Sequence, residues 1–318
     1  LGPSSGIALE VRDTRGDAGT AAAAARGAAA DGAALILGPL FAASVEAAGT
    51  AAAPEGVAVI AFSNTPSVAG DGVWLAGPLV TGETDRILGH AAAQGVRGVS
   101  VYLPDDAQGA AVRAAAERAA GRFGLRLSPV TAYPRSFEGI QETSEGHAQA
   151  HKAEGAQAVL LPDYGQGLQA AGSFLAYHGL DSRNTLRLGL ADWNDPAIAS
   201  EASLLGGRFA APDPNRLAEF AARFEAAYGR KPTALAWVGY DAAAAAAQML
   251  ARARARGDDT PFDAEAITDP AGFQGAAGPF QFTPDGLNRR ALAVVEITRE
   301  GFAIREPAPA ALVAGPGA

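Results

Sequence analysis

The stretch ALILGPLFAASVEAAGTAAAPEGVAVIAFSNT, residues 34–65, decides the fold that we expect for this chain. Its first apolar run ends in Gly38-Pro39, and its second, Val57 to Ala61, stops just before Ser63-Asn64-Thr65. An alanine-rich segment of helical character, from about Ala42 to Ala53, separates the two runs. This order predicts two parallel strands joined by a helix, with both carboxyl ends at one edge of a sheet.

In open α/β sheets, ligands bind at the edge where the carboxyl ends of the strands lie. The residues expected there are Gly, Pro, Ser, Asn and Thr, which offer backbone N–H groups and hydroxyls to a polar ligand. They include no strong nucleophile, base or metal ligand. The stretch therefore predicts a site that holds a ligand without converting it.

Length and composition narrow the class of protein. The 318 residues suit two α/β domains, because domains usually hold roughly 100 to 200 residues. Apolar residues make up 48% and charged residues 19%, which argues against extended disorder. A net charge of -9 disfavours nucleic acid and acidic lipid as partners. No apolar run reaches the roughly 18 residues of a membrane span, and the absence of cysteine excludes disulfides and thiol catalysis.

Strands and helices alternate in two series, the first from Ile7 to Gln94 and the second from Gly98 to Leu190. The first series opens with an alternating segment, Ile7 to Arg12, that reads as a strand. Two helical segments follow at Arg216 to Tyr228 and Trp237 to Ala255, and the chain then has the strand and turn pattern of a β ribbon. Such alternation predicts an α/β fold of two doubly wound parallel-sheet lobes joined by a hinge.

We expect the chain to cross between the lobes three times, near Leu79, Ala210 and Arg290. The predicted division is 1–79 with 211–290 for lobe I, 80–210 with 291–308 for lobe II, and a frayed tail at 309–318.

Four short motifs appear in a familiar order: Leu-Gly-Pro-Leu at 37–40, Ala-Phe-Ser-Asn-Thr at 61–65, Leu-Pro-Asp-Tyr at 161–164 and Gly-Tyr-Asp-Ala at 239–242. In this order the chain resembles the type I periplasmic binding proteins, and most of all their leucine/isoleucine/valine-binding group. The resemblance implies a non-catalytic solute-binding protein of an ABC transporter, located in the periplasm. It also implies that a small, amino-acid-like ligand is held in a cleft between lobes that close by hinge motion.

A narrower resemblance rests on Ala-Asp-Trp-Asn-Asp-Pro at 191–196, Gly-Gly-Arg-Phe-Ala-Ala-Pro-Asp-Pro at 206–214 and the glycine-rich motif at 272–286. These look like penicillin-binding protein activators, outer-membrane lipoproteins of the same fold. This alternative implies a lipid anchor on a removed N-terminal segment and a peptidoglycan synthase as partner, in place of an ABC permease. Members of the wider family also open with a strand and a helix ahead of the strand expected at Ile7 to Arg12, and both are missing from this sequence.

The resemblance implies that a ligand carboxylate lies near the loop after Leu40 and near Ser63 to Thr65, while the ligand ammonium meets acidic or aromatic groups of lobe II. Ala42 stands where a serine is usual, and Gln108 replaces an aromatic residue. Trp193 would cap the cleft. The candidate ligand-binding residues are Leu40, Phe41, Ala42, Ser63, Asn64, Thr65, Gln108, Tyr164, Asp192 and Trp193.

Each candidate also has a structural interpretation. Ser63 to Thr65 would cap the next turn, Asp192 and Asp195 would cap a helix before Pro196, and Tyr164 would lie at a rim without a ligand. His147 and His151 lie four residues apart on a predicted helix, but the glutamate of a zinc hydrolase motif is missing beside the first. We therefore expect this pair on a solvated helix face, and we predict no metal, no cofactor and no catalytic residue.

Overall fold

The structure is a computed structural model that describes residues 6–312. The chain divides into two compact units. Within the described residues, unit 1 consists of 6–79, 214–291 and 309–312, and unit 2 consists of 80–213 and 292–308. The predicted boundaries at 210 and 290 lie shortly before these positions. The sequence predicts a frayed tail at 309–318, and residues 313–318 of it lie outside the described residues.

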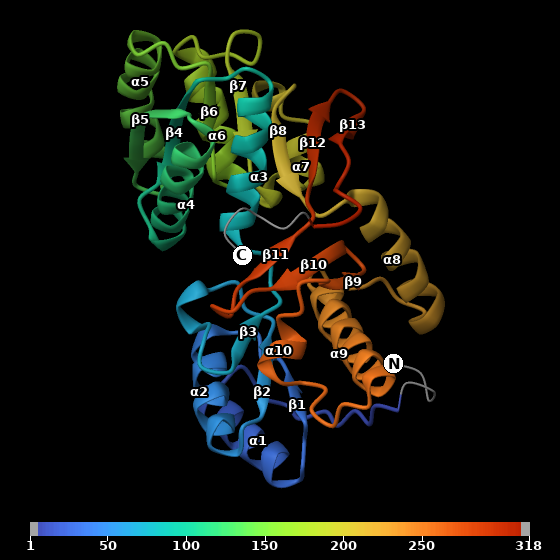
Figure 1. The fold of residues 1–318 in the computed structure, drawn as a ribbon. Helices are drawn as coiled ribbons and strands as arrows, with labels where there is room; N and C mark the ends of the chain where they lie inside the picture. The colour runs from blue at the N-terminus through green and yellow to red at the C-terminus, as the bar shows by residue number, and fades with distance from the viewer. Residues whose placement is uncertain (1–5, 313–318) are drawn as a thin grey trace. The chain divides into compact units, whose positions relative to one another are not determined.

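Unit 1 contains the strand–helix–strand unit that the opening stretch predicts (Figure 1). Strand β1 (Leu35–Leu37) pairs in parallel with β2 (Ala58–Ala61), and α2 (Ala42–Ala52) connects them. Strand β3 (Val73–Leu75) extends this sheet in parallel on the other side of β2. The prediction of parallel strands with their carboxyl ends at a common edge is therefore confirmed.

The remaining elements of unit 1 come from both parts of the chain. A second sheet, with strand order β11-β10-β9, is antiparallel. The elements are α1 (Ala18–Ala30), the 3-10 helices Ala53–Glu55 and Pro66–Val68, α8 (Pro214–Tyr228), α9 (Ala236–Arg256), α10 (Ala264–Ile267), β9 (Phe273–Gly275), β10 (Gly278–Phe282) and β11 (Asn288–Arg290).

The parallel sheet of unit 1 has a core on each face. On one face Val59 and Leu75 pack with Val45 of α2. On the other face Ile60 packs with residues of α9 and with Phe280 of β10. Burial on both faces explains why β2 reads as a continuous apolar run rather than as an alternating one.

One predicted strand is wrong: residues 6–12 form no strand in the structure. The side chains of Leu9 and Val11 are 68% and 85% exposed. Arg12 instead pairs with Glu10 and Asp31. Alternation of apolar residues indicates a strand only where a neighbouring strand completes the ladder, and within the described residues this segment pairs with none.

Unit 2 is built on a seven-stranded sheet in the order β13-β12-β8-β7-β6-β4-β5. The five strands from β8 to β5 are parallel, and β12 and β13 add an antiparallel ribbon at one side. Its strands are β4 (Gly98–Pro104), β5 (Arg126–Tyr133), β6 (Ala158–Leu160), β7 (Leu186–Gly189), β8 (Arg208–Ala211), β12 (Ala293–Thr298) and β13 (Gly301–Glu306).

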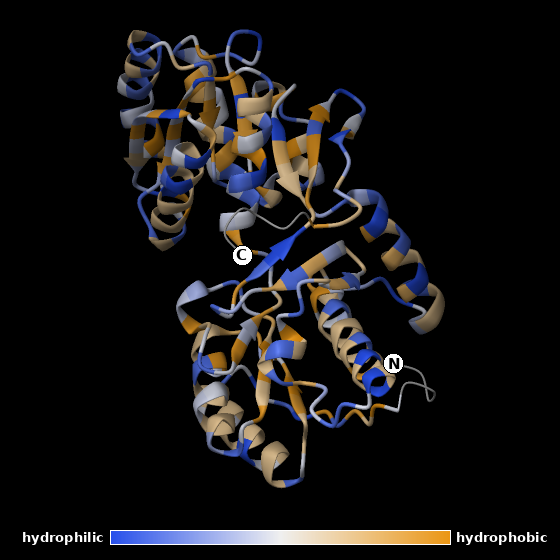
Figure 2. Ribbon diagram, in the orientation of Figure 1, coloured by the Kyte–Doolittle hydropathy of each residue, from blue (hydrophilic) through white to orange (hydrophobic). Residues whose placement is uncertain are grey.

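Helices cover both faces of this sheet, as the alternating pattern predicts, and the central strands are mostly hydrophobic in Figure 2. Helices α3 and α4 pack on one face with Val99 and Val101 of β4. Helices α5 and α6 pack on the other face with Tyr102 of β4. The helices of unit 2 are α3 (Val80–Ala93), α4 (Ala107–Phe123), α5 (Phe137–Ala153), α6 (Gly165–Tyr177), α7 (Pro196–Ala199) and the 3-10 helices Ala191–Trp193 and Ala202–Leu204.

The prediction that His147 and His151 lie on a solvated face of α5 is wrong, because both side chains are buried. The Ser100 hydroxyl lies 2.7 Å from Nδ1 of His151 and 3.2 Å from Nε2 of His147, and Thr131 lies 2.9 Å from Nδ1 of His147. The histidines therefore face two strands of the sheet. Within the described residues no group of three or more His, Cys, Asp and Glu side chains is arranged to hold a metal ion.

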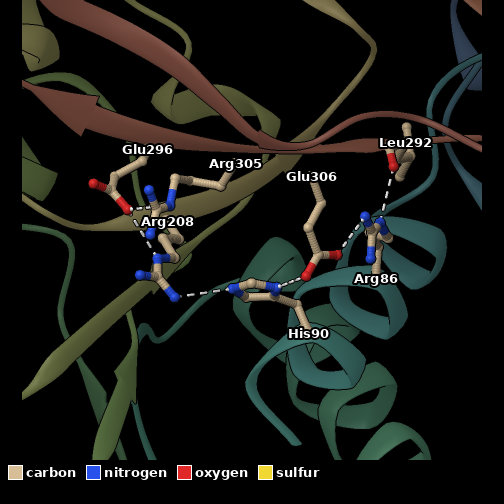
Figure 3. A network of polar contacts seen from close by, with 7 residues as sticks. All are labelled: Arg86, His90, Arg208, Leu292, Glu296, Arg305 and Glu306. Atoms are coloured by element: carbon tan, nitrogen blue, oxygen red, sulfur yellow. Dashed lines mark hydrogen bonds and ion pairs between the residues drawn. The ribbon is translucent and has the colours of Figure 1, made fainter. Parts of the chain in front are cut away.

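A network of charged side chains fastens the antiparallel ribbon to α3 within unit 2 (Figure 3). The Glu306 carboxylate lies between His90, at 2.7 Å, and Arg86, at 2.8 Å. Arg86 also donates from Nε to the carbonyl oxygen of Leu292 at 2.9 Å. On the other side of His90, Arg208 contacts its Nε2 and pairs with Glu296.

No helix in the described part of the chain has the length and apolar character to cross a bilayer.

Candidate functional site

The carboxyl-end edge of the unit 2 sheet gathers polar side chains from four loops. These loops follow β4, β5, β6 and β7, which are neighbouring parallel strands. They contribute Asp106, Arg135, Asp163 with Tyr164, and Asp192, respectively, and Gln108 lies in the first turn of α4, just after Asp106. Loops after parallel strands meet at the same edge, so Gln108 and Asp192, 84 positions apart in the sequence, come into contact.

Arg135 lies at the centre of this group. Its Nε lies 2.8 Å from the Asp106 carboxylate and its Nη1 lies 3.1 Å from that of Asp163. Its guanidinium carbon lies 4.6 Å from the centre of the Tyr164 ring. Arg135 Nη2 also donates to Oε1 of Gln108 at 3.4 Å. One guanidinium thus joins three of the four loops.

Asp163 is a buried, fixed carboxylate in this group, with an exposed fraction of 1%. Its Oδ2 accepts from the hydroxyl of Tyr133 at 2.7 Å, and its Oδ1 accepts from the backbone N–H of Tyr164 at 2.8 Å. Burial and the neighbouring Asp163 charge raise the pKa of Tyr133 well above its ordinary value, so this hydroxyl remains a donor at any physiological pH.

Asp192 lies at the surface of unit 2 and accepts from Nε2 of Gln108 at 3.2 Å. Partial loss of hydration and the nearby charge of Asp163 raise the pKa of Asp192. Beside it, Glu83 of α3 is buried and accepts from the backbone N–H of Ala191 at 3.0 Å. Burial, with a contribution from Asp192, raises the pKa of Glu83 to about 8.

Two structural interpretations of this segment can be judged from the contacts. Asp195 caps α7 by accepting from the N–H of Ala197, as expected for a residue before Pro196. The Asp192 side chain caps neither α7 nor the 3-10 helix Ala191–Trp193. Tyr164 is 49% exposed and lies directly before α6. Gln108 and Asp192 do come together, as a pair of polar side chains from two loops.

The structure contradicts the prediction that Trp193 caps a ligand. Its side chain has an exposed fraction of 0% and packs in the core of unit 2. Its Nε1 donates to the carbonyl oxygen of Leu161 at 3.0 Å. Gly189 and Gly207 approach the indole so closely that a Cβ at either position would lie under 3 Å from the ring. Trp193 therefore fills a close-packed interior position and offers no surface to a ligand.

The candidate residues of unit 1 lie where β1 and β2 end. Ser63 is buried, and its hydroxyl accepts from the backbone N–H of Thr65 at 3.2 Å. This contact supports the interpretation of Ser63 as a residue that caps a turn. Asn64 is exposed and Thr65 is half-buried, and the Thr65 side chain does not cap the 3-10 helix that follows it.

Leu40 and Phe41 are exposed, and Phe41 occupies the position just before α2. Phe41 has no side-chain oxygen, so no side chain caps the first N–H groups of α2, which begins at Ala42. Serine at this end would satisfy one of these groups or contact a ligand. The start of α2 therefore presents backbone donors with the positive end of the helix dipole.

The sequence analysis missed Asp106, Arg135, Asp163 and Glu83 as members of the group in unit 2. Asp106, Arg135 and Asp163 lie two or three residues after β4, β5 and β6, so their position after a strand was a usable signal. Glu83 had no such signal, because it lies on a helix and its burial depends on how α3 packs against the loop after β7.

Comparison with known proteins agrees with this architecture. Residues 5–302 match the family model described as periplasmic binding protein, and the chain belongs to this family. Its type I branch accounts for the doubly wound sheet of unit 2 and for the segmented path of the chain between the two units. A search of curated proteins found no match.

Three solved structures illustrate the shared fold. A branched chain amino acid ABC transporter periplasmic ligand-binding protein from Burkholderia xenovorans is 20% identical, with a TM-score of 0.71 and coverage of 94% of this chain and 84% of that one. An ABC transporter substrate-binding protein from Desulfitobacterium hafniense in complex with Leu is 18% identical, with a TM-score of 0.67 and coverage of 93% and 88%.

The third, a solute binding protein of an ABC transporter from Rhodopseudomonas palustris in complex with 3,4-dihydroxy benzoic acid, is 18% identical, with a TM-score of 0.64 and coverage of 98% and 88%. At these identities the likeness concerns the fold alone. The narrower resemblance to penicillin-binding protein activators finds no support in the family match or in these structures.

Proposed function

We propose that this chain is the periplasmic solute-binding protein of an ABC transporter and that its ligand carries an amino group, as an amino acid does. The observation that carries the proposal is the polar edge of unit 2, where exposed Asp192, held by Gln108, lies in the same group as exposed Tyr164. Family membership supports the solute-binding role, and two of the similar structures are named for transport of, or complex with, amino acids.

The charges of this edge favour a cation. Asp106, Asp163 and Asp192 bring three carboxylates to a group whose one guanidinium belongs to Arg135. An ammonium group next to Asp192 would form a charge-assisted hydrogen bond and lower the excess of negative charge. The exposed Tyr164 ring, which has the Arg135 guanidinium over it, would add apolar contact with the rest of the ligand.

The carboxylate of such a ligand suits the donors of unit 1. The first N–H groups of α2, next to Phe41, are uncapped by a side chain and lie at the positive end of the helix dipole. Thr65 adds a hydroxyl near the end of β2. The family resemblance implies that one ligand contacts both sets of residues, and this stays a prediction.

The proposal includes an ABC permease as partner. No contact or surface in the described residues favours a peptidoglycan synthase, so the activator function is not proposed. Ligands with an amino group are a narrower class than the shared fold requires, because one similar structure holds an aromatic acid without an amino group.

Isothermal titration with the natural amino acids and with small organic acids, including 3,4-dihydroxybenzoic acid, tests the proposal. We expect an amino acid to bind, and we expect Asp192→Asn to weaken it by about tenfold or more, because a hydrogen bond to a charged group contributes roughly 1.5–3 kcal/mol. Asp195→Asn is the matched control, since Asp195 lies in the same loop but caps α7, and asparagine caps equally well.

A second pair of variants checks the aromatic contact. Tyr164→Ala should weaken the same ligand, whereas Tyr177→Ala, at the exposed far end of α6, should not. Equal binding by an acid without an amino group, or unchanged affinity in Asp192→Asn, would contradict the proposed ligand class. No heat with any compound would contradict solute binding itself.

A further inference from the structure

Arg135 is bound by the polar edge of unit 2 in the way that a protein binds a foreign cation. Its guanidinium contacts carboxylates on two different loops, at 2.8 Å to Asp106 and 3.1 Å to Asp163. A ring from the second of these loops, that of Tyr164, lies under the guanidinium at 4.6 Å. Two carboxylates and an aromatic face form a recognition site for a planar cation.

The two carboxylates are held in place without help from Arg135. The Asp106 carboxylate caps α4 by accepting from the N–H of Gly109 at 2.9 Å. Asp163 is buried and is fixed by Tyr133 and by the backbone of Tyr164. Because each carboxylate has its own anchor, the cation position should persist when the arginine side chain is removed.

Arg135 itself enters from the loop after β5, an edge strand of the sheet, and its side chain keeps an exposed fraction of 27%. Its partners lie on the loops after β4 and β6. The side chain thus reaches a position that is accessible from the surface and that a small solute could also reach. Gln108, which accepts from Arg135 and donates to Asp192, lies between this position and the third carboxylate of the edge.

We propose that Arg135 is a specificity-determining residue whose guanidinium occupies the cation position formed by Asp106, Asp163 and Tyr164. The resident guanidinium directs the amino group of a ligand to Asp192 and excludes a second cationic group, such as the side chain of arginine or lysine. The exclusion of a second cation rests on the proposed function, but the existence of the filled position does not.

The existence of the position can be tested in the full chain without knowing the natural ligand. Arg135→Ala removes the resident cation, and methylguanidinium chloride is then titrated by calorimetry, with methylammonium chloride and potassium chloride as comparisons. We expect methylguanidinium to bind Arg135→Ala in a ratio of one to one, about tenfold or more tighter than it binds the wild type. Methylguanidinium should also raise the melting temperature of the variant more than methylammonium does.

Arg183→Ala is the matched control. Arg183 is an exposed arginine that pairs with a single carboxylate, that of Asp181, and its removal should create no such binding. If Arg135→Ala does not fold, Arg135→Asn serves in its place, because its short side chain also leaves the cation position open. Restoring the fold with methylguanidinium during refolding would support the proposal equally.

A folded Arg135→Ala or Arg135→Asn protein that shows no preference for methylguanidinium would overturn the proposal, as would an equal response in Arg183→Ala. Adding Tyr164→Ala to Arg135→Ala should abolish most of the gain. This titration and the Asp192→Asn experiment fail independently: methylguanidinium binding with no amino acid binding refutes only the proposed function, and the reverse result refutes only the role of Arg135.

Discussion

At the scale of single residues, Glu83 shows how burial can hold a proton on a carboxyl group. The side chain is buried, accepts one backbone hydrogen bond from Ala191, and lies near the negative charge of Asp192. Its pKa in the folded protein is raised to about 8 from the ordinary 4.5. The folded protein therefore keeps a proton that the unfolded chain loses at lower pH.

The sign of the effect on stability follows from this difference. The stabilisation is fully present below pH 4.5 and is lost as the pH rises towards 8, because over this range the native state binds more protons than the unfolded state. We expect Glu83→Gln to reduce the decline in the free energy of unfolding between pH 5 and pH 8, by up to about 1.4 kcal/mol per pH unit. Urea denaturation at a series of pH values measures it.

Glu142→Gln, an exposed substitution on α5, is the control and should leave the decline as it is in the wild type. Glutamine keeps an oxygen for the N–H of Ala191, so the fold should be preserved. An identical pH profile in Glu83→Gln and the wild type would show that Glu83 is ionised in the folded protein.

At the scale of elements, the contact between α5 and the sheet depends on two uncharged imidazoles. His147 and His151 share the hydroxyl of Ser100, and the ring of His147 packs against that of Tyr102 at 4.8 Å. Burial lowers the pKa of His147 to about 3, and burial followed by the charges of Arg187 and Lys152 lowers that of His151. Protonation of either ring places a poorly compensated charge in the interior.

Acid should therefore weaken this unit. The unfolded histidines take up protons near pH 6.5, whereas folded His147 does so only near pH 3, so stability is lost as the pH falls between these values. We expect His147→Gln to reduce this loss in the free energy of unfolding, by up to about 1.4 kcal/mol per pH unit between pH 6 and pH 4. Thermal unfolding followed by circular dichroism gives the profile.

The control variant is His178→Gln, at the end of α6, where the histidine is half-buried and lies outside this cluster. It should follow the wild-type profile. If His147→Gln and His178→Gln lose stability with acid to the same extent, the buried pair is not the cause.

The same helix shows why part of the structure could be predicted and part could not. The presence of α5 followed from the alternation of strands and helices between Gly98 and Leu190, and in the structure Ser136 caps its first turn. The burial of His147 did not follow, because it depends on Ser100 and Thr131, two polar residues on the facing strands. Polar residues that satisfy one another across an interface look like solvent-exposed residues in a sequence.

The candidate site divides in the same way. Tyr164, Gln108 and Asp192 were predicted from the family resemblance, and in the structure each lies shortly after a strand, where the fold brings such positions together. Trp193 follows the same strand as Asp192 but turns inward, into a space beside Gly189 and Gly207 that the sequence pattern does not reveal. The prediction of a strand at Ile7 to Arg12 was wrong for a related reason, since the alternation of apolar residues carries no information on whether a partner strand is present.

At the scale of the whole molecule, each unit is held together by segments that are distant in the sequence. In unit 1, Arg290 of β11 joins both parts of the chain: it pairs with Asp241 of α9 at 2.6 Å and donates to the carbonyl oxygen of Ala76 at 2.6 Å. The guanidinium lies between the rings of Trp237 and Phe280, at 4.8 and 4.7 Å. Asn288 adds bonds to the carbonyl oxygens of Leu75 and Gly77.

Because the ion pair of Arg290 and Asp241 is buried, removing one partner leaves an isolated charge in the core of unit 1. We expect Arg290→Met to destabilise unit 1 by roughly 3–5 kcal/mol. Amide hydrogen exchange should then quicken in β1 to β3 and β9 to β11, while the central strands of unit 2, which have their own core on each face, keep their protection. Arg289→Met, at the exposed neighbouring position, should leave both units unchanged. Equal loss of protection in the two units of Arg290→Met would mean that they unfold as one cooperative body, whereas the separate cores and the segmented chain predict two.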